Sequence, residues 1–339
     1  MVSRQGKKLV RHIARMASVL LLIVIFSVST PGIARASTSV SVTASVLNAT
    51  PVVTNVKICL VSESGDCINN TLIRPDIGAD KTFRIFADVN DENGNADITS
   101  VAGKFYREPV TASCSSDGND CYTGITCSVA ATYTDVTQQY ICLVTVKYWI
   151  DPMVSTADDY ANQNWIISIT ATDSSSASAI GANTTDVDEV LALSGFPTSV
   201  NYGTHTLGFQ SSTSDNVTAT VTQSGNVDAD IEISGDSSTM TCTILGSIPI
   251  GNQKFQSYSS TNVGYSGSGL TLTTTPQRIQ LYDGTVGDGA IRRRTTDTGY
   301  SAAGHAAFNI AIPSSGVKGS CSATASVTTV KHSVSGGGG

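Results

Sequence analysis

The sequence predicts an all-β protein made of two β-sandwich domains in series, stabilised by disulfides and preceded by a cleaved signal peptide. Three observations carry this prediction. Only 14% of the 339 residues are charged, and Ser, Thr, Val, Ala and Gly dominate, which favours strands over long helices. Apolar and polar residues alternate in many short segments. Eight cysteines follow a leader of secretory type.

The predicted signal peptide comprises residues 1–36. An apolar run at residues 19–28 precedes Ala34-Arg35-Ala36, a small-x-small cleavage pattern before Ser37. The run is shorter than the roughly 20 apolar residues that span a bilayer, and Pro31 interrupts its continuation. We therefore expect a secreted, cell-surface protein that meets a membrane only transiently, through its signal peptide; a retained anchor is the alternative. The basic residues ahead of the run are Arg4, Lys7, Lys8, Arg11 and Arg15.

The chain after the leader is acidic. The leader holds six of the 20 Lys and Arg residues and no acid, so the remaining 303 residues carry 14 basic against 27 acidic side chains, a formal charge of −13. This balance disfavours electrostatic binding to nucleic acid or anionic lipid. A chain of this length is typical of about two domains.

The cysteines predict disulfide bonds, because an even number in an exported chain is usually oxidised. Short separations along the chain suggest the pairs Cys59–Cys67, Cys114–Cys121 and Cys127–Cys142 in the first half, with Cys242–Cys321 joining the second half to itself. A structural zinc site is disfavoured, since no C-x-x-C motif is present and the histidines are scattered.

The first domain is expected at residues 51–195, after an N-terminal strand at residues 37–50. Period-two alternation predicts strands at residues 52–61, 82–88, 98–106, 140–149 and 165–173. Polar stretches at residues 90–97 and 113–120 are typical of turns, and residues 153–164 suit a short helix or an irregular crossover. Residues 174–188 are expected to form a loop ahead of a last strand near residues 190–193. Strands without intervening helical periodicity indicate a sandwich.

The second domain is expected at residues 196–335. Residues 258–269 and 283–299 are predicted to be long hairpin loops, and residues 336–339 a flexible glycine tail. The predicted strands are residues 200–202, 205–209, 217–222, 227–233, 240–245, 270–274, 279–282, 306–312 and 321–331.

Two stretches resemble known modules. TATVTQSGNVDADIEISG (residues 218–235) resembles the Ig-like modules of prokaryotic surface proteins. FADVNDENGNADITSV (residues 86–101) is similar to the strand–turn–strand of bacterial Ig-like and cadherin-like repeats, and WIISITATD (residues 165–173) to a late strand of the same kind. The resemblance implies two tandem Ig-like sandwiches at the cell surface without catalytic activity. Such modules form stalks, surface layers, filaments and adhesins.

The densest polar loop, residues 88–97, is a candidate calcium site, because calcium binds six to eight oxygen ligands. The candidate ligands are Asp88, Asn90, Glu92 and Asp97. The loop does not match an EF-hand, because no Glu occupies the twelfth position counted from Asp88. We favour a solvated hairpin loop whose Asn and Asp side chains cap turns, and expect no cofactor, with calcium as the alternative.

Other candidate sites involve glycans. N-x-[ST] sequons at Asn48, Asn69, Asn183 and Asn216 predict a glycoprotein if the host glycosylates such sites. Trp149 and Trp165 are either stacking platforms for sugars or, as we prefer, buried tryptophans of a sandwich.

No arrangement typical of catalysis is found. The histidines after the leader, His205, His305 and His332, lack a G-x-S-x-G serine, and the cysteines are assigned to bridges. The basic run at residues 292–294 is interpreted as a solvated loop tip. We therefore expect a protein that is not an enzyme.

The predicted function is structural: a subunit of a surface layer, stalk or extracellular filament that associates with itself or with other surface proteins. The strand after the cleavage site alternates Val40, Val42, Ala44 and Val46 with Ser and Thr. It could add to the sheet of a neighbouring subunit, although pairing within its own domain is preferred. The alternative is an adhesin or carbohydrate-binding module that recognises a glycan through the loops at residues 258–269 and 283–299.

Overall fold

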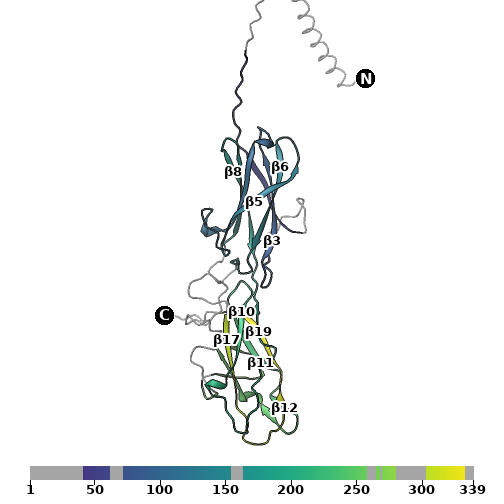
Figure 1. Ribbon diagram of the computed structural model, residues 1–339, viewed down its shortest axis with the longest axis vertical. Coiled ribbons are helices and arrows are strands. Elements are labelled where there is room, and N and C mark those ends of the chain that lie inside the picture. Colours follow the sequence, from purple (N-terminus) through teal and green to yellow (C-terminus); the bar gives the residue numbers. More distant parts are fainter. Residues whose placement is uncertain are drawn as a thin grey trace, which may run out of the picture. The chain divides into compact units, whose positions relative to one another are not determined.

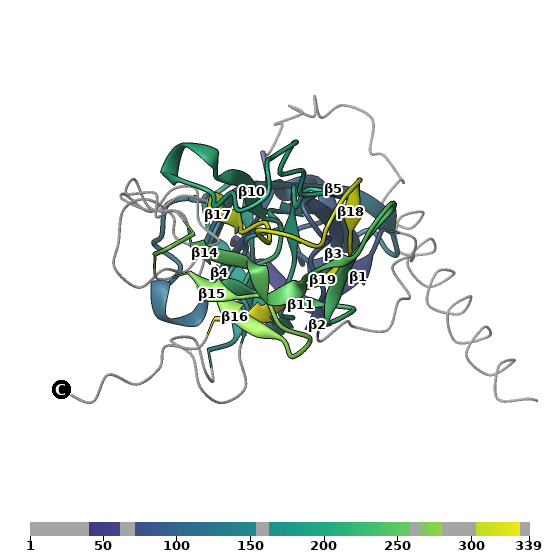
Figure 2. The same cartoon turned by 90° about the horizontal axis from the view of Figure 1, so that it is seen from below.

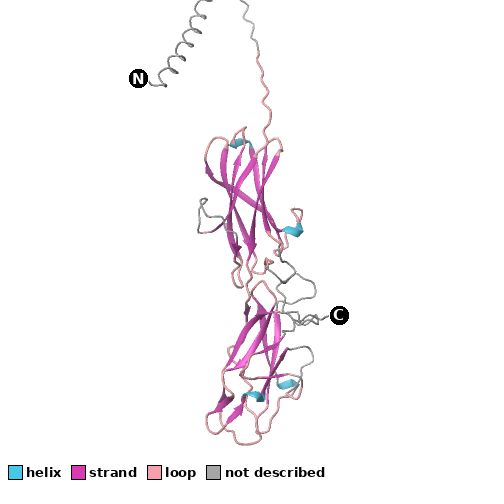
Figure 3. Ribbon diagram, turned by 180° about the vertical axis from the view of Figure 1, so that it is seen from behind, coloured by secondary structure: helices cyan, strands magenta, loops and turns pink. Residues whose placement is uncertain are grey.

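The computed structural model describes residues 41–61, 72–153, 163–257, 265–267, 269–279 and 303–332. Within these ranges the regular structure consists of β-strands and four short 3₁₀ turns, with no α-helix (Figures 1 and 3). The prediction of an all-β fold is therefore confirmed. The turns are η1 (Asn95–Asp97), η2 (Glu108–Val110), η3 (Thr213–Asp215) and η4 (Ile250–Asn252).

Strands β1 to β8, here called the first sheet region, form one eight-stranded sheet in the order β1-β3-β6-β5-β4-β7-β8-β2. Every neighbouring pair is antiparallel except β2 and β8, which are parallel. The strands are β1 (Val52–Leu60), β2 (Leu72–Ile73), β3 (Lys81–Asn90), β4 (Ile98–Arg107), β5 (Cys121–Thr132), β6 (Thr137–Val146), β7 (Trp165–Asp173) and β8 (Ser178–Val187).

This sheet folds over on itself. The beginning of β5 pairs with β4 and its end pairs with β6, so β5 belongs to both halves. Strands β1 and β8, near the two ends of the sheet, meet without a ladder: the Asn183 side chain donates to the Val56 carbonyl over 2.7 Å. Gly181 lies directly under Val53, and a Cβ at position 181 would come within 2.6 Å of Val53 Cγ1. The absence of a side chain at Gly181 allows this close approach.

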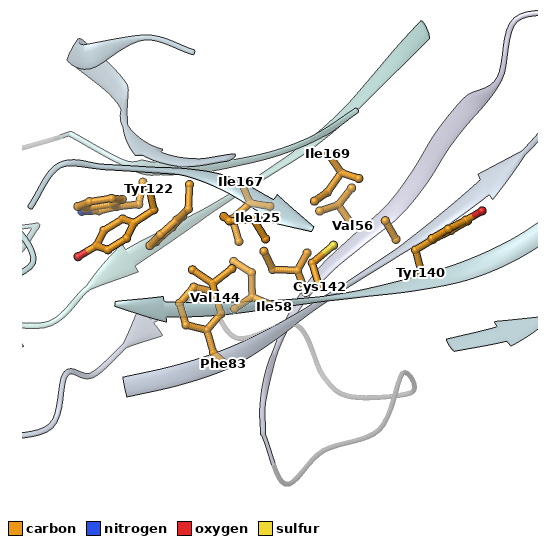
Figure 4. Close-up of a cluster of buried hydrophobic side chains, with 14 of the residues drawn as sticks. Val56, Ile58, Phe83, Tyr122, Ile125, Tyr140, Cys142, Val144, Ile167 and Ile169 are labelled. Carbon is orange, nitrogen blue, oxygen red and sulfur yellow. The ribbon is translucent and has the colours of Figure 1, made fainter. Parts of the chain in front are cut away.

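The first hydrophobic core fills the space between the two halves (Figure 4). Phe105 is its centre: its ring lies 4.5 Å from that of Trp165, 5.4 Å from Phe83 in an edge-to-face contact, and 6.1 Å from Tyr122. Trp165 is fully buried and its indole N–H donates to the Asp151 carbonyl over 2.9 Å. Offset and edge-to-face aromatic contacts of this kind add to the stabilisation from burial.

The second sheet region comprises β9 to β19 and has its own hydrophobic core around Phe255, Ile231 and Ile233. One sheet has the order β15-β14-β17-β10-β9, and two three-stranded sheets have the orders β16-β11-β19 and β13-β12-β18. Figure 2 labels β10, β14, β15 and β17 of the first of these sheets and β11, β16 and β19 of the second. The strands are β9 (Leu193–Ser194), β10 (Val217–Gln223), β11 (Ala229–Gly235), β12 (Thr239–Cys242), β13 (Ser247–Pro249), β14 (Gln253–Ser257), β15 (Leu270–Thr271), β16 (Gln277–Ile279), β17 (Ala303–Ile310), β18 (Cys321–Ser322) and β19 (Ala325–Lys331).

Several predicted elements are corrected. Residues 174–188, expected as a loop, contain the whole of β8, which pairs along β7 despite its small polar residues. The strand expected near residues 190–193 is β9, and it pairs with β10 of the second sheet region instead of closing the first. Residues 205–209 form a turn, not a strand. Most of residues 153–164 and of the two expected long hairpin loops lie outside the described residues.

Three disulfides join the pairs suggested by chain proximity: Cys114–Cys121, Cys127–Cys142 and Cys242–Cys321. The second links directly opposed residues of β5 and β6, and the third links opposed residues of β12 and β18. Cys59 is also disulfide-bonded, while Cys67 lies outside the described residues. The last bridge closes the longest loop of the three, with a separation of 79 residues, and loop-closure entropy gives it the largest expected contribution, about 4 kcal/mol.

The turn between β10 and β11 packs against the segment that follows β8. Asn226 is fully buried, and its side-chain amide donates to the carbonyls of Asp188 and Ile150 while its Oδ1 accepts the Val190 N–H. A Cβ at Gly225 would lie 1.9 Å from the Val190 carbonyl oxygen, so only glycine fits there. Gly225 in this Ser-Gly-Asn turn therefore allows the turn to contact the backbone of Val190.

We expect Gly181→Val to lower the free energy of unfolding by about 1–3 kcal/mol, because the new side chain would overlap Val53 and its carbonyl oxygen. Ala182→Val is the matched control: position 182 is exposed on the same strand, so its effect should stay within about 0.5 kcal/mol. Urea unfolding of the two variants checks this. Equal stabilities would show that β1 and β8 do not approach as described.

Candidate functional site

Three carboxylates converge at one end of the first sheet region. Asp91, Asp97 and Asp173 each place an oxygen so that the three atoms lie within 4.8 Å of one another. Asp91 directly follows β3, Asp97 ends the η1 turn before β4, and Asp173 ends β7. The β4–β7 ladder begins with Ile98 opposite Asp173, which brings the η1 turn against the end of β7. We call these three residues the carboxylate cluster.

The carboxylate cluster is held by hydrogen bonds from neutral groups. Asp91 Oδ1 accepts the Asn93 N–H over 2.8 Å, and Asp97 accepts the hydroxyl of Ser174. Asp173 Oδ1 accepts the backbone N–H groups of Ser175 and Ala177 over 2.9 and 2.8 Å. These contacts fix where the oxygens point without neutralising their charge.

The second oxygen of Asp173 is bound by the side chain of Asn48. The Asn48 amide donates to Asp173 Oδ2 over 2.7 Å, and the next residue, Ala49, donates its N–H to Asn93 Oδ1 over 2.5 Å. The Asn48 hydrogen bond, followed by those from Ala177 and Ser175, lowers the pKa of Asp173 below its ordinary value against the opposing effect of burial. These hydrogen bonds therefore favour the ionised form of Asp173.

Asp91 contributes a carboxylate that has no ion-pair partner among the described residues. It is 1% exposed, and its Oδ2 is buried without a hydrogen-bond partner. In the described part of the chain, no Lys, Arg or His forms an ion pair with any member of the carboxylate cluster. Burying a carboxylate without a cation or a full set of donors is costly.

The predicted calcium ligands are only partly brought together, and this set is corrected. Asp97 belongs to the carboxylate cluster, but Asp88 accepts the Asn55 side chain on the sheet, and Asn90 donates to Thr137 of β6. Glu92 is exposed. Successive side chains along β3 point to opposite faces, so Asp88 and Asn90 share one face and Asp91 lies on the other. Asp91 was not among the predicted ligands.

The sequons occupy different environments. The Asn48 side chain is engaged with Asp173 and that of Asn183 with Val56. Asn216 is half-buried, with both polar side-chain atoms shielded from solvent. Asn69 lies outside the described residues. The hydrogen bonds of Asn48 and Asn183 give these side chains a structural role in the folded protein.

A groove of ≈ 390 Å³ opens in the second sheet region. Its lining is largely apolar and includes Val200, Met240, Phe308 and Val327. Tyr202 also lines it, and burial raises the pKa of this phenol, whose hydroxyl donates to the Gln253 side chain over 3.0 Å. β19 pairs with β11 along one edge, and among the described strands none pairs with its other edge.

The N-terminal segment behaves differently from the predicted strand. The chain divides into two compact units at Leu47 and Asn48, and residues 41–50 form no strand. Val42 and Val46 are 89% and 85% exposed, and Ala44 is also exposed; Val40 lies outside the described residues. The preferred expectation, that this strand pairs within its own domain, is wrong for the described part.

A second charged cluster occupies the opposite end of the β4–β7 ladder. The Arg107 guanidinium lies 3.2 Å from carboxylate oxygens of both Asp120 and Asp151, and Asp151 is fully buried. Burial, then the hydrogen bond and charge of Asp117 and the charge of Asp151, raise the pKa of Asp120 to about 6, with Arg107 opposing. Here a buried cation compensates the acids, which gives this cluster a structural role.

The remaining candidate residues do not converge on one site. Trp165 is buried in the core, whereas Trp149 lies after β6, half-buried, with the Lys147 ammonium 5.5 Å from its ring centre. His205 stacks on Phe209, His305 contacts Thr220 over 3.1 Å, and His332 contacts Asp230 over 2.9 Å. The histidines thus have separate local partners.

No protein-family model matches the chain, and a search of curated proteins finds no match. Among the described residues, no helix is long and apolar enough to cross a membrane.

The raised pKa of Asp120 predicts a pH dependence of stability. The folded state retains this proton up to about pH 6, whereas the unfolded chain releases it near its ordinary pKa of about 4. Stability associated with Asp120 therefore decreases as the pH rises from 4 to 7. Relative to Asp120→Asn, which does not titrate, wild type should lose about 1–2 kcal/mol over this range, allowing for solvent screening.

Urea unfolding of wild type and Asp120→Asn at pH 4.5 and pH 7 measures this difference. Asp76→Asn is a control, because the Asp76 carboxylate is 54% exposed in its contact with Lys81. A wild-type protein whose stability changes with pH in parallel with Asp120→Asn would contradict the assignment.

Proposed function

We propose that the protein is a non-catalytic structural protein of the cell surface, a surface-layer, stalk or fibre subunit that assembles by adding its N-terminal strand to a neighbouring copy. Export is supported by the leader pattern of residues 1–36. The oxidised cysteines suit an oxidising, extracellular environment. The resemblance of residues 86–101 and 218–235 to Ig-like surface modules is in keeping with the same role.

One observation carries the proposal: the chain has an exposed apolar strand sequence and an open apolar groove. Val42, Ala44 and Val46 alternate with Ser and Thr and are exposed. Val327 of β19 is 38% exposed, although it faces the groove that leads to the second hydrophobic core. Exposed apolar positions of a regular period-two segment are costly for a monomer and favourable for β-strand addition.

The dimensions of the two parts are compatible. Residues 37–47, if extended, reach about 36 Å at 3.3 Å per residue, and β19 with its 7 residues reaches about 23 Å. An added strand would gain main-chain hydrogen bonds from the outer edge of β19. Its alternate Val and Ala side chains would enter the groove beside Val200 and Phe308, while its Ser and Thr side chains would face solvent.

We expect the mature protein beginning at Ser37 to form multimers at high concentration, and a variant lacking residues 37–47 to remain monomeric, because the donor strand is gone. Light scattering with electron microscopy measures both. In the full-length mature chain, Val42→Ser combined with Val46→Ser should weaken assembly at least tenfold through lost apolar burial. The control Ser41→Thr with Thr43→Ser changes only the polar face.

The edge of β19 that would receive the added strand is tested separately by Val327→Lys, which places a charge in the groove. Thr328→Lys on the opposite face of the same strand is its matched control and should assemble like wild type. Multimers that persist without residues 37–47, or a mature protein that stays monomeric at millimolar concentration, would refute strand addition.

A further inference from the structure

We propose that Asp91, Asp97 and Asp173 form a binding site for one calcium ion, which joins the start of the folded body to the two loops at this end of the first sheet region. The proposal does not depend on the assembly function, because it rests on the carboxylate cluster alone.

The carboxylate cluster buries negative charge. Asp91 and Asp173 are 1% and 2% exposed, yet the described part of the chain places no basic side chain in contact with them. Two buried carboxylates within 4.8 Å of each other and of Asp97 repel one another strongly unless a cation or a proton intervenes. At the other end of the ladder, Arg107 supplies that cation; at this end the described residues supply no such cation.

One oxygen of Asp91 has no hydrogen-bond partner among the described residues. Asp91 Oδ1 is occupied by the Asn93 N–H, and Oδ2 is buried with no partner. A polar atom in that position is normally satisfied by a hydrogen bond, a water or an ion. Asp97 and Asp173 each place a carboxylate oxygen within 4.8 Å of an oxygen of Asp91, so a cation between the three would satisfy Asp91 and relieve the repulsion together.

The donor set selects calcium among common cations. All three side chains offer oxygen, which excludes a site of the Cys and His type preferred by zinc. The ligands come from one loop, between β3 and β4, and from the end of β7. This flexible arrangement suits the six to eight ligands of calcium better than the strict octahedron of magnesium. Backbone carbonyls of the two loops and water would complete the coordination.

The site also fixes the point where the N-terminal segment leaves the folded body. Asn48 is bound to Asp173, and Ala49 to Asn93 of the loop that carries Asp91 and Asp97. Calcium would hold Asp173 and this loop together, and would therefore hold residues 48 and 49 in place. Hydrogen exchange at Ala49 and Asn93 should slow when calcium binds.

The test uses the mature protein after removal of metal with EGTA, titrated with calcium chloride by calorimetry and followed by thermal melting. We expect one ion per chain and a rise in Tm of about 4 °C at ten times the Kd. Magnesium at the same concentration should act more weakly, and sodium chloride of equal ionic strength should have no such effect. No heat and no change in Tm at about 5 mM calcium, above the usual range of extracellular sites, would overturn the proposal.

Two variants separate a calcium site from a general effect of acidic residues. Asp91→Asn keeps the oxygen that accepts the Asn93 N–H but removes the carboxylate charge. The variant should therefore lose the calcium-dependent rise in Tm. In EGTA it should melt at or above the wild-type temperature, because a buried uncompensated charge is gone. Glu92→Gln is the matched control, since Glu92 is exposed in the same loop, and should respond to calcium like wild type.

An equal calcium response in Asp91→Asn and Glu92→Gln would refute the assignment. If Asp91→Asn does not fold, Asp97→Asn at the half-buried position decides the question: a Kd at least tenfold weaker supports the site, and an unchanged Kd overturns it.

Discussion

The pairing of β4 with β7 is the interaction on which the rest of the first sheet region depends. The ladder runs from Ile98 opposite Asp173 to Arg107 opposite Trp165. Between these ends it places Phe105 beside Ile167 and Gly103 beside Ile169, at the centre of the hydrophobic core. A slip of one residue would turn every one of these side chains to the other face, so the apolar pattern of the two strands fixes their register.

That register also decides where charge is buried. One end of the ladder holds Arg107 between Asp120 and Asp151, a buried network in which the positive charge offsets the cost of desolvation. At the other end, the described donors to the three carboxylates are all neutral. The same ladder thus produces a self-contained structural cluster at one end and an incomplete, anionic one at the other. This difference in charge compensation, and not the number of acidic residues, distinguishes the carboxylate cluster as the proposed cation site.

The sequence predicted those features that depend on local pattern. The all-β class follows from alternation and composition, and the three disulfides of the described chain follow from short separations between cysteines. β8 was missed because its residues are small and polar, and its strand conformation comes from pairing with β7, a tertiary effect that overrides propensity. Residues 41–50 were predicted to be a strand but form none. A regular period-two pattern does not say which sheet, if any, a segment pairs with.

Of the three residues of the carboxylate cluster, the sequence predicted one as a ligand. The loop of residues 88–97 was identified from its density of oxygen-bearing side chains, and Asp97 was among the selected ligands. Asp91 could have been favoured as the first residue after a strand that already carries Asp88 and Asn90 on its surface. Asp173 is far away along the chain and reaches the site only through the β4–β7 register, which single-sequence patterns do not provide. Asn48, selected as a sequon, proved to be a hydrogen-bond donor to that same carboxylate.

A crystal structure of the mature protein grown with calcium, with anomalous diffraction recorded at long wavelength, tests the central claim most directly. The account predicts that Ile98 lies opposite Asp173 and that an anomalous peak lies about 2.3–2.6 Å from oxygens of Asp91, Asp97 and Asp173. A shifted register, or an Asp91 carboxylate that turns to solvent with no ion between the three acids, would contradict it.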